Sequence, residues 1–399
     1  MKKNVIICLT AIIVIILFSF IYDNIIYKKQ SSEFNEVEII ISETQENKAV
    51  VTNSMEFVKA LENGNIQIIE ITKDIDMGYK LFEKYGIESQ YLNKHNEPLT
   101  HPILKETGVS KLKIQNKNNL IIYSLSGCKL LHTNILINNS KNIKISNIKM
   151  EEMWEWDEYS EARYDKNDWD YITIRNSENI EISNCEFSKA YDGITDIINS
   201  NGITIKNCRL NEIDLINDKF YNKQFEELEK NIEEYPMYYY LRKKIYLSIE
   251  EIKQLSSYQY KLYLVRTDNN DKKCRNIVIH DNLFYNVKTR VPLAKNSDIY
   301  VYNNYVDSSK INYNLISKKN KKEIRQKYKK FIDLNSHGII ATDNSKIIAK
   351  NCIFNGTKYE YESKDEEISD KSGKIYVYND VIDLLYLKQR LEIIAGIGR

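Results

Sequence analysis

The feature that most constrains the fold is a short phrase that recurs along the chain. Residues 179–187 read NIEISNCEF, and residues 202–210 read GITIKNCRL. Asn184 and Asn207 occupy the same position in the two copies, and a period of about 20 to 50 residues is typical of stacked-repeat proteins. Isoleucine alternates with polar residues in each copy, which predicts a short β-strand. Such a strand is too short to be stable alone, so the copies must pair with one another.

Related phrases recur in both directions from this pair. Strands that stack in register, one per coil of about 22 residues, predict an all-β parallel β-helix. We expect the repeated asparagines to point inward as a ladder, with each amide bonded to the next coil, and Ile and Val to fill the interior. The residues at the Asn184 position of the other copies are Ser124, Asn147, Asp281, Asn303, Asn351 and Asn379.

The composition of the chain fits a folded protein with a large core. The chain has 399 residues, of which 42% are hydrophobic and 28% charged. Its formal net charge is +1, and acidic and basic residues are interleaved, which gives no support for nucleic-acid binding.

The N-terminus resembles an export signal. Two lysines precede residues 5–22, which carry no charge. We expect residues 1–30 to be a signal or membrane anchor, residues 31–51 a polar tether and residues 52–399 the β-helix. No small-residue cleavage site follows the apolar segment, and its length approaches that of a membrane span, so an uncleaved anchor is favoured over a cleaved signal and over a buried core helix. The protein is then extracellular, either secreted or anchored, and we expect a monomer.

The cysteines favour packing over disulfides or metal binding. Cys185, Cys208 and Cys352 each directly follow a repeated asparagine. This position predicts small buried side chains stacked at one corner of the coil. An exported chain could instead use its six cysteines in disulfides. No cysteine has the spacing to another cysteine or to a histidine that a metal site requires.

Helical segments flank and interrupt the repeats. The residues after Thr52 predict a capped amphipathic helix that covers the end of the solenoid. Helical insertions are expected at about 212–272 and 310–335. Tyrosines of the first insertion could stack on sugar rings, although packing on the β-helix is favoured. The second insertion is basic. It is either a helix that is only exposed to solvent or a segment that attracts a polyanion.

An acidic cluster lies within the central repeats. Asp168 and Asp170 begin one coil, and Asp192 and Asp196 begin the next. Because stacked coils are neighbours, the four carboxylates can converge on one face, where they repel unless a cation binds. An all-oxygen set of this kind suits Ca²⁺. The alternative is that these acids only form turns.

A basic motif follows further along the chain. Arg290 and Lys295 flank Pro292 just before a predicted strand. If the strands stack as expected, this motif sets fixed positive charges on the same face as the acids. A pair of ordinary surface cations is the alternative.

Taken in order, these motifs resemble the calcium-dependent pectate lyases, and the resemblance implies that the parallel β-helix is right-handed. The resemblance rests on DWD, NIEISNCEFS, YDGITDI, RVPLAK, IYVYNNYV and HGIIATDNSKIIAKNCIF, and it covers about residues 52–380 apart from the two insertions. It implies that Asp168, Asp170, Asp192 and Asp196 are calcium ligands and that Arg290 is the catalytic base. Lys295 stands where the family has a second arginine. The family also has a substrate-binding lysine after the coil of Asn207, and Lys219 is the candidate here.

The implied reaction is β-elimination of polygalacturonate or a related acidic polysaccharide. Ca²⁺ would act as a Lewis acid on the C6 carboxylate, Arg290 would remove the C5 proton and Lys295 would hold the carboxylate. Because arginine normally stays protonated, we expect an alkaline optimum. Two alternatives remain open: a catalytically inactive β-helix that binds acidic polysaccharide at the cell surface, and a β-helix hydrolase. A hydrolase needs a second carboxylate pair, which does not stand out near Arg290.

Overall fold

The computed structural model describes residues 47–95, 99–156, 169–257, 261–268, 272–311, 314–327, 335–364 and 372–379. The predicted signal or anchor at 1–30 and most of the tether lie outside these ranges. From Ala49 onward the chain forms one compact unit. Within the described ranges, no helix has both the length and the apolar character that a membrane crossing requires.

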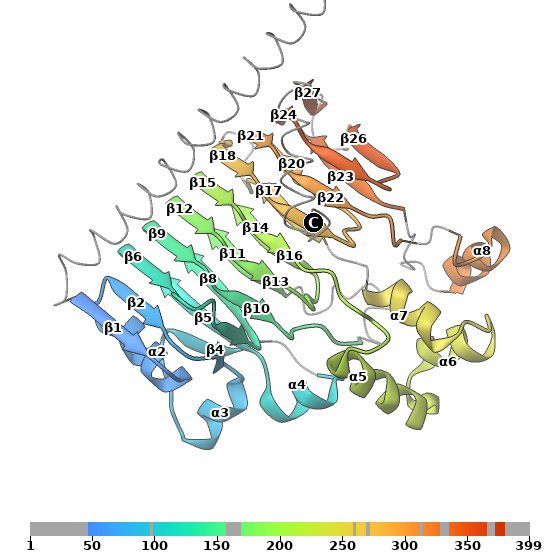
Figure 1. Ribbon diagram of the computed structural model, residues 1–399, viewed down its shortest axis with the longest axis horizontal. Helices are drawn as coiled ribbons and strands as arrows, with labels where there is room; N and C mark the ends of the chain where they lie inside the picture. The colour runs from blue at the N-terminus through green and yellow to red at the C-terminus, as the bar shows by residue number, and fades with distance from the viewer. Residues whose placement is uncertain are drawn as a thin grey trace, which may run out of the picture. The chain divides into compact units, whose positions relative to one another are not determined.

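The unit is a right-handed parallel β-helix, as predicted, but each central coil carries three strands (Figure 1). One coil consists of β11 (Asp170–Arg175), β12 (Glu178–Ser183) and β13 (Glu186–Phe187). The next consists of β14 (Gly193–Ile198), β15 (Asn201–Lys206) and β16 (Arg209–Leu210). The expectation of one strand per coil was therefore wrong. The recurring phrase spans only the second and third strands, because the first strand of each coil has a more variable sequence.

Strands at the same position in successive coils form three sheets, which we call A, B and C. Register is kept between coils: Ile180 pairs with Ile203 in sheet A and Ile174 with Ile197 in sheet C. Besides the strands above, sheet A contains β1 (Lys48–Val51), β2 (Ile68–Ile71), β6 (Asn118–Tyr123), β9 (Lys141–Ser146), β18 (Cys274–His280), β21 (Ser297–Tyr302), β24 (Lys346–Lys350) and β27 (Lys374–Tyr378). Sheet B contains β3 (Ile75–Asp76), β7 (Lys129–Leu131), β10 (Lys149–Glu151), β19 (Leu283–Tyr285), β22 (Tyr305–Asp307) and β25 (Ile353–Asn355). Sheet C contains β4 (Leu92–Lys94), β5 (Ser110–Gln115), β8 (Thr133–Asn138), β17 (Lys261–Arg266), β20 (Leu293–Lys295), β23 (His337–Thr342) and β26 (Tyr359–Ser363).

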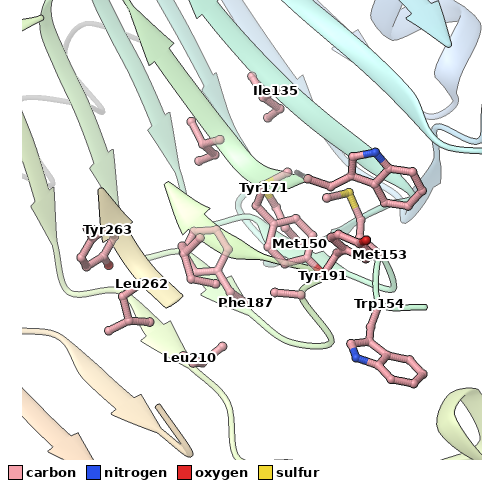
Figure 2. Packing of buried hydrophobic residues seen from close by; sticks show 14 of the residues in the cluster. Ile135, Met150, Met153, Trp154, Tyr171, Phe187, Tyr191, Leu210, Leu262 and Tyr263 are labelled. Carbon is pink, nitrogen blue, oxygen red and sulfur yellow. The ribbon is translucent and has the colours of Figure 1, made fainter. Parts of the chain in front are cut away.

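The interior is filled by aliphatic columns along the strands and by larger side chains near the turn that leads to sheet C. Figure 2 shows Met150, Tyr171, Phe187 and Tyr191 gathered in this part of the core. Each of them is at most 1% exposed. The Tyr171 hydroxyl donates to the carbonyl oxygen of Ser188, so the buried phenol keeps a polar partner.

The capped helix predicted after Thr52 is α2 (Ser54–Glu62). The Asn53 side chain accepts a hydrogen bond from the Glu56 amide at 3.0 Å, and the apolar face of the helix is buried in the core. The remaining helices are α3 (Tyr79–Lys84), α4 (Pro102–Thr107), α5 (Lys219–Lys230), the 3₁₀ helix η3 (Ile232–Glu234), α6 (Pro236–Lys243), α7 (Ile249–Ser257) and α8 (Lys318–Lys327).

The predicted ladder of repeated asparagines is formed only in part. Asn351 is buried and donates to Asn303 at 3.5 Å, and Asn303 donates to Asp281 at 3.3 Å. Asn184 and Asn207 have φ angles of +56° and +53°, in the left-handed region that asparagine tolerates better than most residues. This turn conformation leaves Asn184 exposed and Asn207 half-buried. The residue after each asparagine points inward instead, and this interior column contains Cys185, Cys208, Asn282, Asn304 and Cys352.

The cysteines behave as predicted. The five in the described ranges are all buried and unpaired. The polar members of the same column are hydrogen-bonded: Asn282 donates to the Asn304 side chain at 2.8 Å and accepts from the Cys208 amide at 2.8 Å.

The first insertion is shorter than predicted. Strand β17 lies inside the range 212–272 and pairs in register with β14, so the helical excursion ends before Lys261. The insertion packs on the residues that follow β10: the Trp156 ring meets Tyr238 edge-on at 5.5 Å, and Tyr238 is fully buried. This supports packing over sugar stacking for that tyrosine.

Candidate active site

Sheet C brings the predicted acidic and basic residues onto successive coils. Its strand order is β11, β14, β17, β20 (Figure 1). Asp170, Asp192, Lys261 and Arg290 lie at or just before the starts of these four strands. The Asp192 amide donates to the Trp169 carbonyl, and the Lys261 amide donates to the Asp192 carbonyl, both at 3.2 Å. The Tyr263 amide donates to the Arg290 carbonyl at 2.8 Å. Acids thus occupy the first two coils and cations the next two.

Two of the predicted calcium ligands meet at Gly193. Asp170 pairs with Gly193 in the β11–β14 register, and both Asp170 and Asp192 are buried, with exposures of 5% and 3%. A Cβ atom at Gly193 would overlap an oxygen of the Asp170 carboxylate. Glycine at this position therefore leaves the space that the Asp170 carboxylate occupies.

Lys261 is a further candidate site residue, which was not among those predicted from the sequence. Its ammonium forms an ion pair with the Asp192 carboxylate. It begins β17, which is the first strand after the coil of Asn207 once the insertion is passed. Lys219, the predicted candidate, is instead an exposed residue at the first position of α5. The alternating pattern of KLYLVR, read as a strand, is the signal that would have identified Lys261.

Asp196 lies further along β14. It pairs in register with Thr173 on one side and Leu264 on the other, and its side chain is half-buried. Asp168 lies outside the described residues. Among the residues that the structure does describe, no three acidic, histidine or cysteine side chains are grouped as a metal site. The carboxylate oxygens suit Ca²⁺ chemically, while the ammonium of Lys261 already neutralises Asp192.

Arg290 has a backbone conformation that is rare for a residue with a side chain. Its φ is +64°, in the left-handed region. Hydrogen bonds on both sides hold it there: its carbonyl accepts from β17, and the Val291 amide donates to the Gly338 carbonyl at 2.9 Å. Residues held in such conformations cost on the order of 1 kcal/mol and cluster at functional sites. The Arg290 side chain is half-buried.

Lys295 ends β20 on the outer face of the sheet. It pairs in register with Arg266 of β17, which in turn pairs with Ile198 of β14. Lys295 is half-buried, whereas its neighbour Ala294 points into the core. Arg290 and Lys295 therefore come from the same coil, one before and one at the end of a three-residue strand.

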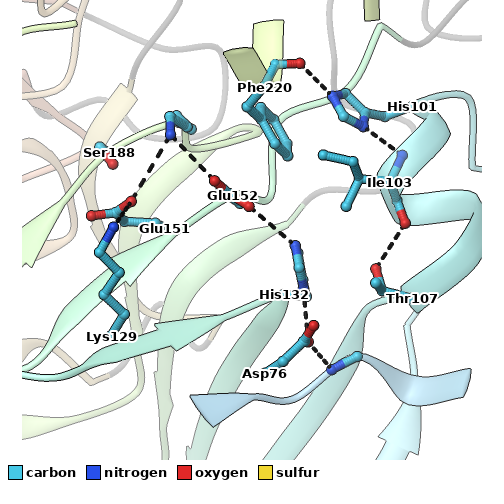
Figure 3. A network of polar contacts seen from close by, with 12 residues as sticks. Asp76, His101, Ile103, Thr107, Lys129, His132, Glu151, Glu152, Ser188 and Phe220 are labelled. Atoms are coloured by element: carbon cyan, nitrogen blue, oxygen red, sulfur yellow. Dashed lines mark hydrogen bonds and ion pairs between the residues drawn. The ribbon is translucent and has the colours of Figure 1, made fainter. Parts of the chain in front are cut away.

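A partly buried charge network contacts the segment that leads to Asp192, and Figure 3 shows its members Asp76, His132 and Glu152. Lys189 lies three residues before Asp192 and forms ion pairs with Glu152 at 3.4 Å and Asp218 at 3.3 Å. Burial lowers the pKa of Lys189, but these carboxylates outweigh it and the pKa is raised. The network thereby ties the start of helix α5 to the turn before the site.

The network continues to His132. This ring is nearly fully buried between Asp76, at 2.8 Å, and Glu152, at 3.5 Å. Burial lowers the pKa of His132, but the hydrogen bonds and charges of the two carboxylates outweigh it and raise the pKa to about 9. Burial raises the pKa of Glu152, and His132 together with Lys189 lowers it to about 2. These ion pairs fix a set of charged side chains next to the candidate site.

The chain is similar to known proteins over most of its length. A protein family described as "Pectate lyase" matches residues 254–386. Pectate lyase B of Paenibacillus amylolyticus is 32% identical over 335 residues, which cover 82% of this chain and 84% of that protein. The solved structure of a pectate lyase from Paenibacillus sp. 0602 is 29% identical, with a TM-score of 0.77, and the match covers 84% of this chain and 78% of that one.

Proposed function

The chain belongs to the pectate lyase family and is a polysaccharide lyase, and we propose that it cleaves polygalacturonate or a related acidic polysaccharide on the outer face of sheet C. The observation that carries this proposal is the alignment of Asp170, Asp192, Lys261 and Arg290 on four successive coils. A polyuronate carries one carboxylate per sugar. A face with fixed cations beside acids can hold such a chain and act on it.

Each residue has a separate role in the elimination. Lys295 and Lys261 bind substrate carboxylates, which places a uronate ring against Arg290. Arg290 removes the proton from C5, the electron pair forms a double bond between C4 and C5, and the glycosidic oxygen on C4 leaves and takes up a proton from solvent. Neutral guanidine is needed for this step, so activity rises toward alkaline pH. Lys261 takes the role that the sequence analysis gave to Lys219.

Calcium is the proposed cofactor. Asp170, Asp192 and Asp196, together with Asp168, would hold it. Bound there, Ca²⁺ would withdraw electron density from the substrate carboxylate and so acidify the C5 proton. The Lys261 ammonium must then leave the Asp192 carboxylate and pair with a substrate carboxylate. Loss of the Lys261–Asp192 ion pair therefore accompanies substrate binding.

An inactive polysaccharide-binding protein is not favoured. That alternative rested on the absence of a lysine after the coil of Asn207, and Lys261 supplies a cation at that place. We further propose that the protein acts outside the cell as a monomer, exported by residues 1–30 and held at the membrane by them. Fractionation of a C-terminally tagged protein tests this: recovery of a soluble form that begins after Tyr27 would show that the signal is cleaved.

The reaction is tested by ultraviolet absorbance, which detects the conjugated double bond of an unsaturated uronide. We expect absorbance to rise when polygalacturonate is added at alkaline pH with calcium, and chelation to stop it. Lys261→Ala should weaken substrate binding, and Lys219→Ala is the matched control that should behave like wild type. New chain ends without absorbance would indicate hydrolysis instead.

A further inference from the structure

A second basic surface lies on sheet A, at the C-terminal coils. A cavity of about 490 Å³ opens there, lined by Lys273, Asp298, Lys346, Lys374 and Tyr376, with Asn344, Ser345 and Ser372. Three lysines and one aspartate give the lining a net positive charge. None of these residues belongs to sheet C, so this cavity is separate from the candidate active site.

The register of sheet A arranges these residues in columns. Asp298, Lys346 and Lys374 pair with one another at the starts of β21, β24 and β27. Lys273 donates to Asp298 at 3.0 Å and to the Asn344 carbonyl at 2.6 Å, which fixes one edge of the cavity. The cationic side of the cavity is therefore built on regular strands, whose spacing is set by backbone hydrogen bonds.

Exposed tyrosines lie further along two of the same strands. Tyr300 and Tyr376 lie on either side of Ile348 in the register, and their exposures are 46% and 40%. Tyr378, which pairs with Lys350, is 55% exposed. The Lys346 ammonium lies 5.4 Å from the centre of the Tyr376 ring. A charged surface that is only solvated does not need large exposed aromatic rings beside its lysines.

We infer that this sheet A surface, comprising Lys346, Lys374, Tyr300, Tyr376 and Tyr378, binds a second stretch of acidic polysaccharide. Lysines pair with uronate carboxylates, and tyrosine rings stack on the apolar faces of the sugars. Strands about 4.8 Å apart present these groups repeatedly to an extended polymer. The inference rests on the proposed function for the identity of the polymer. Its consequence is that long chains are bound at two places and short ones at one.

The test compares polymeric polygalacturonate with trigalacturonate. In the Lys346→Glu/Lys374→Glu variant we expect affinity for the polymer to fall by at least about fivefold, because two attractions become repulsions. Turnover of trigalacturonate should stay within about twofold of wild type. Tyr376→Ala should weaken polymer binding without changing the charge. Lys59→Glu/Lys73→Glu is the control with the same charge change; Lys59 lies in α2 and Lys73 follows β2, so both are in the N-terminal part of the β-helix.

Affinity electrophoresis in gels containing polygalacturonate measures binding whether or not the enzyme turns over. Unchanged polymer affinity in the Lys346→Glu/Lys374→Glu variant would overturn the inference, as would an equal loss in the control variant. Absence of lyase activity in the wild type would instead count against the proposed function. In that case the binding comparison still decides the inference.

Discussion

Replacing Gly193 by alanine would perturb the acidic side of the site with a single methyl group. The φ angle of Gly193 lies outside the left-handed region, so the backbone accepts alanine. The new Cβ would overlap an Asp170 carboxylate oxygen and lie 3.2 Å from the Lys261 carbonyl. To restore van der Waals contact, the carboxylate must move by roughly 1 Å. We expect the free energy of unfolding to stay within about 2 kcal/mol of wild type, because only the end of one side chain shifts.

Activity should respond far more than stability does. A displacement of about 1 Å in a catalytic arrangement can lower the rate by about 100-fold. The assay is kcat/KM on polygalacturonate at saturating calcium, measured beside urea denaturation of the same protein. Gly64→Ala is the control, since its Cβ meets nothing within 4 Å and its backbone is equally permissive. A fully active Gly193→Ala enzyme would refute the role of Asp170 in the site.

Four further predictions concern individual side chains. Asp196→Ala should weaken calcium binding in calorimetry, and equal affinity in the two proteins would remove Asp196 from the ligand set. Arg290→Lys should lose turnover through kcat with calcium-dependent substrate binding largely kept, whereas Lys295→Ala should mainly weaken substrate binding; wild-type turnover in Arg290→Lys would show that another group is the base. His132 has its pKa raised from 6.5 to about 9, so its contribution to stability should be full below pH 6.5 and lost as the pH rises through 9. Urea denaturation of wild type and His132→Gln across this range checks it, and a difference that grows with pH would contradict the ion-pair account.

The parallel β-helix could be predicted because its signal is local and repeated. Alternation of isoleucine with polar residues identifies the sheet A strands, and a constant spacing implies stacking. Alternation does not report φ, so it could not show that Asn184 and Asn207 lie in turns rather than point inward. Asn184 at +56° turns the chain, and the next residue, Cys185, takes the interior position. A preference of asparagine for the left-handed region is the only hint that the sequence offers.

The site was predicted in part for a related reason. Asp170, Asp192 and Arg290 lie at or just before strand starts in recognisable phrases. The structure places Asp170 and Asp192 on successive coils of sheet C and Arg290 two coils further along. Lys261 was missed because a long helical insertion separates it from its neighbours in space. The pairing of β14 with β17 restores that neighbourhood, and pairing across an insertion follows from tertiary register rather than from local pattern.

Elimination on the outer face of sheet C is tested by the masses of the products. Trigalacturonate would be incubated with the enzyme and calcium at alkaline pH, and the products analysed by mass spectrometry. Elimination predicts two fragments whose masses add up to that of the substrate, one of them unsaturated, since no water enters the products. Fragments whose combined mass exceeds that of the substrate by one water molecule would contradict the account and indicate a hydrolase.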